Sequence, residues 1–217
     1  MDFYHVLNRG VEKRNIVMHD DDRMRFIRSL YMFNDARPVH NASSSKGTVR
    51  KKRTENLLVH IHAWCLMDNH YHLLLSPVND KIENLSLFIK KLNGGYAKFF
   101  NEKYDRSGYL WQGKTKKILI KNDAQFLYIP YYIHLNPLDY SHKNWRNGSV
   151  KNTTRAIKTL HDYRWSSFND YSGKNNFPSL LSMKALTKIL GTTKKQTATI
   201  KDILQKSYPL KNSDVLE

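Results

Sequence analysis

The fold is decided by residues 57–77, LLVHIHAWCLMDNHYHLLLSP. Two runs rich in strand-forming residues flank residues 67–69, Met-Asp-Asn, and the Asp-Asn pair favours a turn. The stretch therefore predicts an antiparallel hairpin. Side chains alternate along a strand, so His70 and His72 point to one face of the second strand. Tyr71, Leu73 and Leu75 point to the other face. One face is left for the core and the other for two imidazoles.

Each strand of this hairpin carries a His-x-His pair. Neutral imidazoles at such spacing can share a divalent cation, so His70 and His72 are candidate metal ligands. A partly exposed strand edge produces the same pattern without any metal. His60 and His62 have the same spacing on the preceding strand, so either pair can supply the ligands, or one pair can support the other. Spacing alone leaves this choice open.

The segments around the hairpin predict alternating strands and helices. Their periodicity predicts strands over residues 3–8 and 111–120, and helices over 20–33, 83–104 and 122–136. This order indicates an α+β sandwich rather than a doubly wound sheet. Pro130 lies inside the last of these helices, which therefore either kinks or begins at that proline. Pro137 disfavours helical geometry at Asn136, where the helix should end.

Four further segments complete the chain, of which three are polar or aromatic and the last is predicted to be helical. Residues 37–56 contain a basic cluster and predict a long loop or insertion, which is either solvated or in contact with a DNA backbone. Residues 141–160 are polar, and the aromatic run at 163–171 is interpreted as packing. Residues 179–208 predict two short helices broken around Gly191.

The composition points to a polyanionic partner. Lys and Arg number 36 against 19 Asp and Glu, which gives a net charge of +17. Such an excess attracts nucleic acid independently of sequence. We find no apolar run long enough to span a bilayer, no basic amphipathic anchor and no signal peptide, so no membrane partner is expected. A single cysteine, Cys65, excludes an intramolecular disulfide and suits a reducing cytoplasm.

Five motifs occur in the order found in one family. They are LMDNHYHLLL at 66–75, HVLNRG at 5–10, GYLWQGKTK at 108–116, YIHLNPL at 132–138 and YRWSSFNDY at 163–171. This set resembles the HUH (His-hydrophobic-His) single-tyrosine transposases, and specifically their REP-associated tyrosine transposase branch. Asp68 stands where that family usually has a proline, a change that a turn tolerates. The resemblance covers residues 3–173 and is weaker beyond.

The resemblance implies a fold and a chemistry. The fold would be an HUH endonuclease fold over residues 1–173, a ferredoxin-like antiparallel sheet flanked by helices, with a helical C-terminal extension over 174–217. Tyr132 would be the nucleophile that forms a 5′-phosphotyrosine link. Residues i and i+4 lie one above the other on a helix, so Tyr132 and Asn136 can address one phosphate and one metal. Without the resemblance, Tyr132 is better interpreted as a core aromatic.

The same resemblance implies the cofactor and the partner. His70, His72 and Asn136 would hold Mg²⁺ or Mn²⁺, and the substrate would be single-stranded or hairpin DNA in the cytoplasm, at the nucleoid of a bacterial-type cell. Candidate phosphate contacts are Arg9, Lys13, Arg14, Lys114, Lys116 and Lys117, with Trp111 as either a stacking platform or a core residue. Relatives act as dimers or as monomers, which leaves a homodimer open. The alternatives are a non-catalytic nucleic-acid-binding protein and a metal-dependent hydrolytic nuclease.

Overall fold

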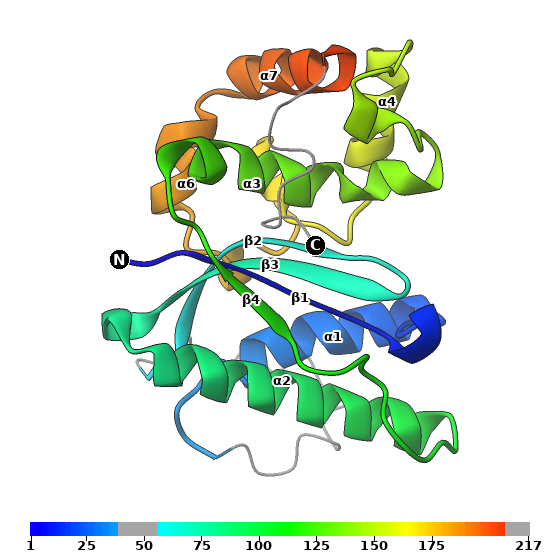
Figure 1. Ribbon diagram of the computed structural model, residues 1–217, viewed down its shortest axis with the longest axis vertical. Coiled ribbons are helices and arrows are strands. Elements are labelled where there is room, and N and C mark those ends of the chain that lie inside the picture. Colours follow the sequence, from blue (N-terminus) through cyan, green and yellow to red (C-terminus); the bar gives the residue numbers. More distant parts are fainter. Residues whose placement is uncertain (39–55, 207–217) are drawn as a thin grey trace.

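A four-stranded antiparallel sheet forms the centre of the molecule (Figure 1). The computed structural model describes residues 1–38 and 56–206, so most of the predicted basic loop, residues 39–55, lies outside the described residues. The strands are β1 (Tyr4–Arg9), β2 (Val59–Leu66), β3 (His70–Pro77) and β4 (Lys116–Leu119), in the spatial order β2-β3-β1-β4. Helix α1 (Asp20–Met32) links β1 to β2, and α2 (Ile82–Lys103) links β3 to β4. This β-α-β-β-α-β order is the ferredoxin-like arrangement that the sequence predicts.

The predicted hairpin is confirmed. Strands β2 and β3 pair antiparallel, with Leu66 opposite Tyr71 beside the turn. A bulge interrupts the register between Ile61 and Ala63. Strand β1 lies on the other side of β3, and its Arg9 pairs with His70. The start of β3 is therefore held on both sides by neighbouring strands, which fixes the direction of the histidines that follow.

Helices α1 and α2 cover one face of the sheet (Figure 1). Tyr71 points to this face, where its ring packs against Phe26 of α1 and its hydroxyl donates to Asn93 of α2 at 2.9 Å. Gly95 in α2 allows close contact between the helices, because a Cβ at this position would come within 2.2 Å of the Phe33 ring. The apolar face predicted for this strand thus forms the lower half of the core.

The opposite face is covered by α3 (Asp123–Leu135), and the C-terminal helices lie beside α3 or beyond it (Figure 1). These are α4 (Thr153–Asp162), α5 (Phe168–Tyr171), α6 (Lys184–Leu190) and α7 (Thr193–Gln205). The side chain of Asn122 caps α3 by accepting from the Gln125 amide at 2.9 Å. Helix α3 continues through Pro130 and ends at Leu135, so the alternative that it begins at the proline is wrong. The end expected before Pro137 is confirmed.

Short 3-10 helices connect these elements. They are η1 (Val11–Lys13), η2 (Val78–Asp80), η3 (Asn136–Tyr140), η4 (Trp145–Asn147) and η5 (Pro178–Leu180). The predicted strand over 111–120 is shorter than expected, because Gly113 adopts a left-handed conformation (φ +67°) that breaks an extended run. The stretch over 141–160, expected only to be polar, contains η4 and α4. The two helices around Gly191 are confirmed.

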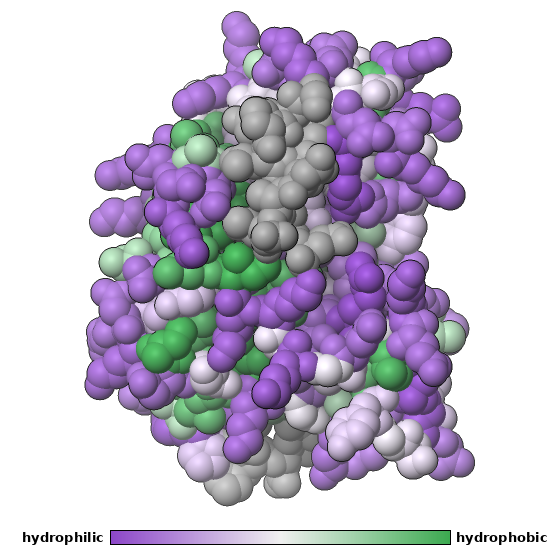
Figure 2. All heavy atoms as spheres, viewed as in Figure 1, coloured by the Kyte–Doolittle hydropathy of each residue, from purple (hydrophilic) through white to green (hydrophobic). Residues whose placement is uncertain are grey.

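The C-terminal helices pack onto the rest of the molecule. The Gln196 side chain of α7 donates to the Tyr171 carbonyl at 2.9 Å, and the Val150 amide donates to the Leu204 carbonyl at 3.1 Å. Figure 2 shows hydrophilic side chains over most of one face of the molecule. Among the described residues, no helix combines the length and the apolar character needed to cross a bilayer.

Candidate active site

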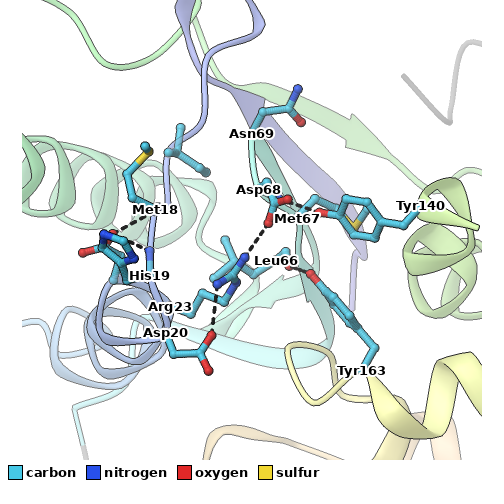
Figure 3. Close-up of polar contacts among 12 residues, drawn as sticks. Met18, His19, Asp20, Arg23, Leu66, Met67, Asp68, Asn69, Tyr140 and Tyr163 are labelled. Carbon is cyan, nitrogen blue, oxygen red and sulfur yellow. Dashed lines mark hydrogen bonds and ion pairs between the residues drawn. The ribbon is translucent and has the colours of Figure 1, made fainter.

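A polar network fixes the turn that precedes β3 (Figure 3). Arg23 of α1 donates to the Asp68 carboxylate at 2.6 Å and to Asp20 at 3.0 Å. The Asp68 amide donates to the Tyr140 hydroxyl at 2.9 Å. Burial lowers the pKa of Arg23, but its bond to Asp68 outweighs this effect and the net pKa is raised. The residue that replaces the family's usual proline is thus anchored from two sides, close to His70.

The histidines of β3 have defined hydrogen-bond partners. His70 Nδ1 lies 2.6 Å from the amide oxygen of Asn69, which can only accept, so Nδ1 carries the proton and Nε2 carries the lone pair. His72 Nδ1 lies 2.9 Å from His5 Nε2 of β1. His72 Nε2 is buried and has no hydrogen-bond partner among residues 1–38 and 56–206. The two imidazole rings lie 5.0 Å apart and are nearly perpendicular.

Both imidazoles are neutral at physiological pH. Burial, with a further contribution from Arg9, lowers the pKa of His70 to about 4. Burial also holds the pKa of His72 well below its usual range, and any protonation of the neighbouring His70 or His5 would lower it further, as the charge of Arg146 does. A neutral imidazole offers a lone pair, which is the form that binds a metal ion.

Tyr132 of α3 faces this histidine cluster. Its ring centroid lies 5.7 Å from that of His72 and 6.0 Å from that of His5, edge-on to both. On its other side the Trp145 ring lies at 6.0 Å. The side chain is 1% exposed, so the predicted nucleophile is buried beside the predicted metal ligands. The structure therefore brings Tyr132 together with the β3 histidines, although they come from distant segments of the sequence.

Asn136, one turn after Tyr132, is fully buried in the same cluster. Its amide nitrogen donates to the Tyr132 carbonyl at 2.8 Å. Its amide oxygen accepts from Arg146 at 3.2 Å. A carbonyl oxygen has two lone pairs, so one remains for a second partner. Asn136 keeps helical dihedrals just after α3 and so lies one turn after Tyr132, and its amide oxygen has an arginine partner that the sequence did not suggest.

Two charged residues near Tyr132, Arg146 and Asp139, were not predicted from the sequence. Arg146 forms an ion pair with Asp139 and lies over the Tyr132 ring, with its Cζ 5.6 Å from the centroid. Asp139 also accepts from the Trp145 indole at 2.6 Å. Trp145 offered a signal, because a large aromatic within a polar stretch indicates a packed segment.

The donor set fits a divalent cation. The unpartnered His72 Nε2 is a buried polar atom that a ligand would satisfy, and His70 Nε2 carries a lone pair nearby. The remaining lone pair of Asn136 adds an oxygen donor. In residues 1–38 and 56–206, no cluster of three histidine, cysteine or acidic side chains could hold a metal ion. A site at this position would therefore combine two imidazoles with an amide.

The second His-x-His pair has a different environment. His62 Nε2 lies 2.8 Å from the Ser76 hydroxyl, and its Nδ1 lies 3.0 Å from the Ser182 carbonyl. Both of its nitrogens therefore have protein partners. His60 Nδ1 contacts the Ser182 hydroxyl at 3.3 Å. These contacts assign His62 a structural role that spacing alone could not assign.

A surface cavity of about 430 Å³ opens beside His70. It is lined by Arg9, Lys13, Asn15, Met67, Asp68, Asn69, His70, Asp139 and Tyr140. Two of the predicted DNA-binding residues, Arg9 and Lys13, thus line the same cavity as His70. The cavity joins the histidine side of the site to the Asp139 side.

The other predicted DNA-binding residues lie apart from this cavity. Arg14 stacks on the Phe100 ring at 6.0 Å. Trp111 donates to the Asn93 carbonyl at 2.9 Å and packs against Tyr71, which favours the interpretation as a core residue. The lysines at positions 114, 116 and 117 are exposed on or beside β4, the edge strand of the sheet.

Comparisons with known proteins agree with the motifs. The family model for IS200-like transposases matches residues 40–136, a segment that contains β2, β3, α2, β4, α3 and Asn136. The resemblance to these transposases is thereby confirmed over that segment. A solved structure of a REP-associated tyrosine transposase bound to a REP hairpin is 14% identical, with 82% of each chain covered and a TM-score of 0.47. A search of curated proteins finds no match.

Proposed function

We propose that this protein is a metal-dependent transposase that cleaves and rejoins single-stranded DNA through Tyr132. The family match over residues 40–136 supports a transposase or endonuclease. The proposal that Tyr132 is the nucleophile rests on its position, because the centroid of its ring lies 5.7 Å from that of His72. The Nε2 atom of His72 has no hydrogen-bond partner among the described residues. The proximity of the two rings supports the pairing of a tyrosine nucleophile with a metal-binding imidazole.

The residues that would hold Mg²⁺ or Mn²⁺ are His70, His72 and Asn136, through Nε2, Nε2 and the amide oxygen. A bound divalent cation supplies Lewis-acid polarisation of the scissile phosphate. His5 orients the His72 ring through its 2.9 Å contact, as partners of metal-binding histidines commonly do. Asn69 fixes the ring of His70 in the same way.

In the proposed reaction, the phenol oxygen of Tyr132 attacks phosphorus. The bond between phosphorus and the 3′ oxygen breaks, and its electron pair goes to that oxygen, which takes a proton from solvent. The phenol proton leaves to solvent. The products are a 5′-phosphotyrosine link and a free 3′ hydroxyl, so the energy of the phosphodiester is kept for rejoining without ATP.

The proposed partner is single-stranded DNA, with a hairpin near the cut. The net charge of +17 supports a polyanion, and Arg9 and Lys13 beside the cavity supply cations next to His70. The hairpin element rests on the resemblance of the five motifs to the REP-associated branch. Because Tyr132 is buried, the strand would approach through the cavity between His70 and Asp139.

The test is a denaturing gel. The protein is incubated with a labelled DNA hairpin that carries single-stranded flanks, in the presence of Mn²⁺, and then denatured. We expect a covalent protein–DNA adduct that Tyr132→Phe abolishes while DNA binding stays close to that of the wild type. Binding without cleavage would support a non-catalytic protein, and cleavage without an adduct would support a hydrolytic nuclease.

A further inference from the structure

The positively charged side chain of Arg146 contacts both Tyr132 and Asn136. Its Nη2 donates to the Asn136 amide oxygen at 3.2 Å, and its Cζ lies 5.6 Å from the centroid of the Tyr132 ring. A side-chain hydrogen bond also joins it to Tyr132. The guanidinium thus contacts the proposed nucleophile and a proposed metal ligand at once.

Two neighbours hold this guanidinium in place. Asp139 of η3 binds its Nη1, and the same carboxylate accepts from the Trp145 indole at 2.6 Å. The Arg146 guanidinium also stacks on the Trp145 ring, with its Cζ 4.6 Å from the centroid. A cation held this firmly loses little conformational entropy when an anion arrives, which makes it suited to stabilising developing charge.

The charge of Arg146 is permanent and reaches the whole site. Burial lowers the pKa of Arg146, but its bonds to Asp139 and Tyr132 outweigh this effect and the net pKa is raised. Its charge also contributes to the lowered pKa values of His70 and His72, after the larger effect of their burial. Arg146 therefore stays protonated and cannot act as a base, but it can bind an anion.

Arg146 can also be reached from solvent. Its side chain is 28% exposed and that of Asp139 is 30% exposed. Asp139 lines the cavity that opens beside His70. A purely structural ion pair would need only Asp139 as its partner, whereas this guanidinium also contacts the Tyr132 side chain, which faces His72, and the Asn136 amide. Arg146 therefore contacts both a residue that lines the cavity, Asp139, and the buried Tyr132.

We propose that Arg146 is a catalytic residue that binds the phenol oxygen of Tyr132 and an oxygen of the scissile phosphate during attack. The inference rests on the function proposed above. As the bond between the phenol oxygen and phosphorus forms and the bond to the 3′ oxygen breaks, negative charge accumulates on the phosphate oxygens. Arg146 offsets this charge through its N–H donors and neither gives nor takes a proton. Asp139 is the positioning residue that aims it.

The test measures the single-turnover rate of adduct formation at saturating hairpin DNA and Mn²⁺. Arg146→Ala should slow adduct formation by about 10²–10³-fold, which is the usual effect of losing one such donor. Millimolar guanidinium chloride should restore part of the rate, whereas the same concentration of NaCl should not. Arg155→Ala, which removes an exposed arginine from α4, is the charge-matched control and should react like the wild type.

A second variant covers the case in which Arg146→Ala does not fold, as judged by thermal unfolding. Arg146→Lys keeps the charge but loses the forked geometry, so its rate should fall between those of the wild type and Arg146→Ala. The proposal is overturned if the folded Arg146 variants react as fast as the wild type, or faster, because Arg146 would then be structural or inhibitory. In that case the function proposed for Tyr132 stands. If the wild type itself forms no adduct, both proposals fail.

Discussion

Strands β2 and β3 carry two His-x-His pairs with the same spacing, and the structure gives them opposite environments. In the β2 pair, both nitrogens of His62 contact protein oxygens, at 2.8 Å and 3.0 Å. In the β3 pair, His72 keeps one buried nitrogen without a partner. Spacing sets which way two imidazoles point, but their partners determine whether a lone pair remains for a ligand.

The surroundings extend this difference between the pairs. The ring of His72 lies 5.7 Å from that of Tyr132, which in turn contacts Arg146 and Asn136. His62 faces Phe3 at 4.9 Å and the segment that precedes α6. Tyr132, the proposed nucleophile, lies next to the β3 pair. The comparison therefore predicts that changes to the two pairs affect different properties of the protein.

The largest expected difference concerns catalysis. His72→Ala should slow adduct formation by about 10³-fold, since loss of a metal ligand removes several kcal/mol of stabilisation from the transition state. His62→Ala, the same change in the other pair, should lower stability and leave the rate of the folded protein near that of the wild type. Single-turnover assays on a DNA hairpin compare the two. Equal losses in both variants would remove the distinction between the pairs.

The next expected effect concerns metal affinity. His5 contacts His72 Nδ1 at 2.9 Å, and removal of such a supporting partner typically weakens metal binding by about 10–100-fold. We therefore expect His5→Phe to raise the dissociation constant for Mn²⁺ by this factor. His60→Asn should leave it unchanged. Titration of Mn²⁺ followed by electron paramagnetic resonance measures both, and an unchanged constant in His5→Phe would contradict the orienting role.

A pH effect of intermediate size follows from the burial of His62. Burial lowers its pKa from 6.5 to about 4 in the folded protein. Between these values the unfolded chain binds one proton more than the folded chain, so stability falls as pH falls from 6.5 to 4. The loss amounts to about 1.4 kcal/mol per pH unit. The free energy of unfolding in urea should depend on pH less steeply in His62→Asn than in the wild type, by the slope that one proton contributes. An identical slope would argue against a buried neutral imidazole.

The smallest effect concerns cations near to and far from the β3 pair. Lys13 lines the cavity beside His70, whereas Lys117 lies on the edge strand and donates to Ser86 at 3.2 Å. If Lys13 contacts one phosphate, Lys13→Ala should reduce the slope of log affinity against log salt by about 0.7 for single-stranded DNA. Lys117→Ala should change it less. Fluorescence anisotropy over a salt series tests this order.

Much of the fold was predictable from local patterns. The alternation in residues 57–77 predicted the hairpin, and apolar spacing predicted α1 and α2, because each element buries one face. Pro130 misled in part, since tertiary packing keeps α3 helical through a residue that isolated helices avoid. The strand over 111–120 was overestimated because the left-handed Gly113 interrupts it.

The candidate site was predictable only where a motif carried it. Tyr132, His70, His72 and Asn136 were assigned to the site through the resemblance; the Tyr132 ring lies 5.7 Å from the His72 ring, and Asn136 bonds to the Tyr132 carbonyl. Arg146, Asp139 and His5 did not enter as site residues, because their roles arise from contacts between segments far apart in the sequence. Local patterns indicate which side chains share a face. They do not indicate which distant side chain will satisfy a given nitrogen or oxygen.

The most direct test of the central claim is to identify the residue that carries the DNA. The adduct formed on a short hairpin is digested with protease and nuclease, and the modified peptide is fragmented by mass spectrometry. We predict a phosphodiester on Tyr132, next to an unmodified Tyr131. A modification on Tyr131 or Tyr96, or cleaved DNA with no modified tyrosine, would contradict the convergence of α3 and β3 on one reacting phosphate.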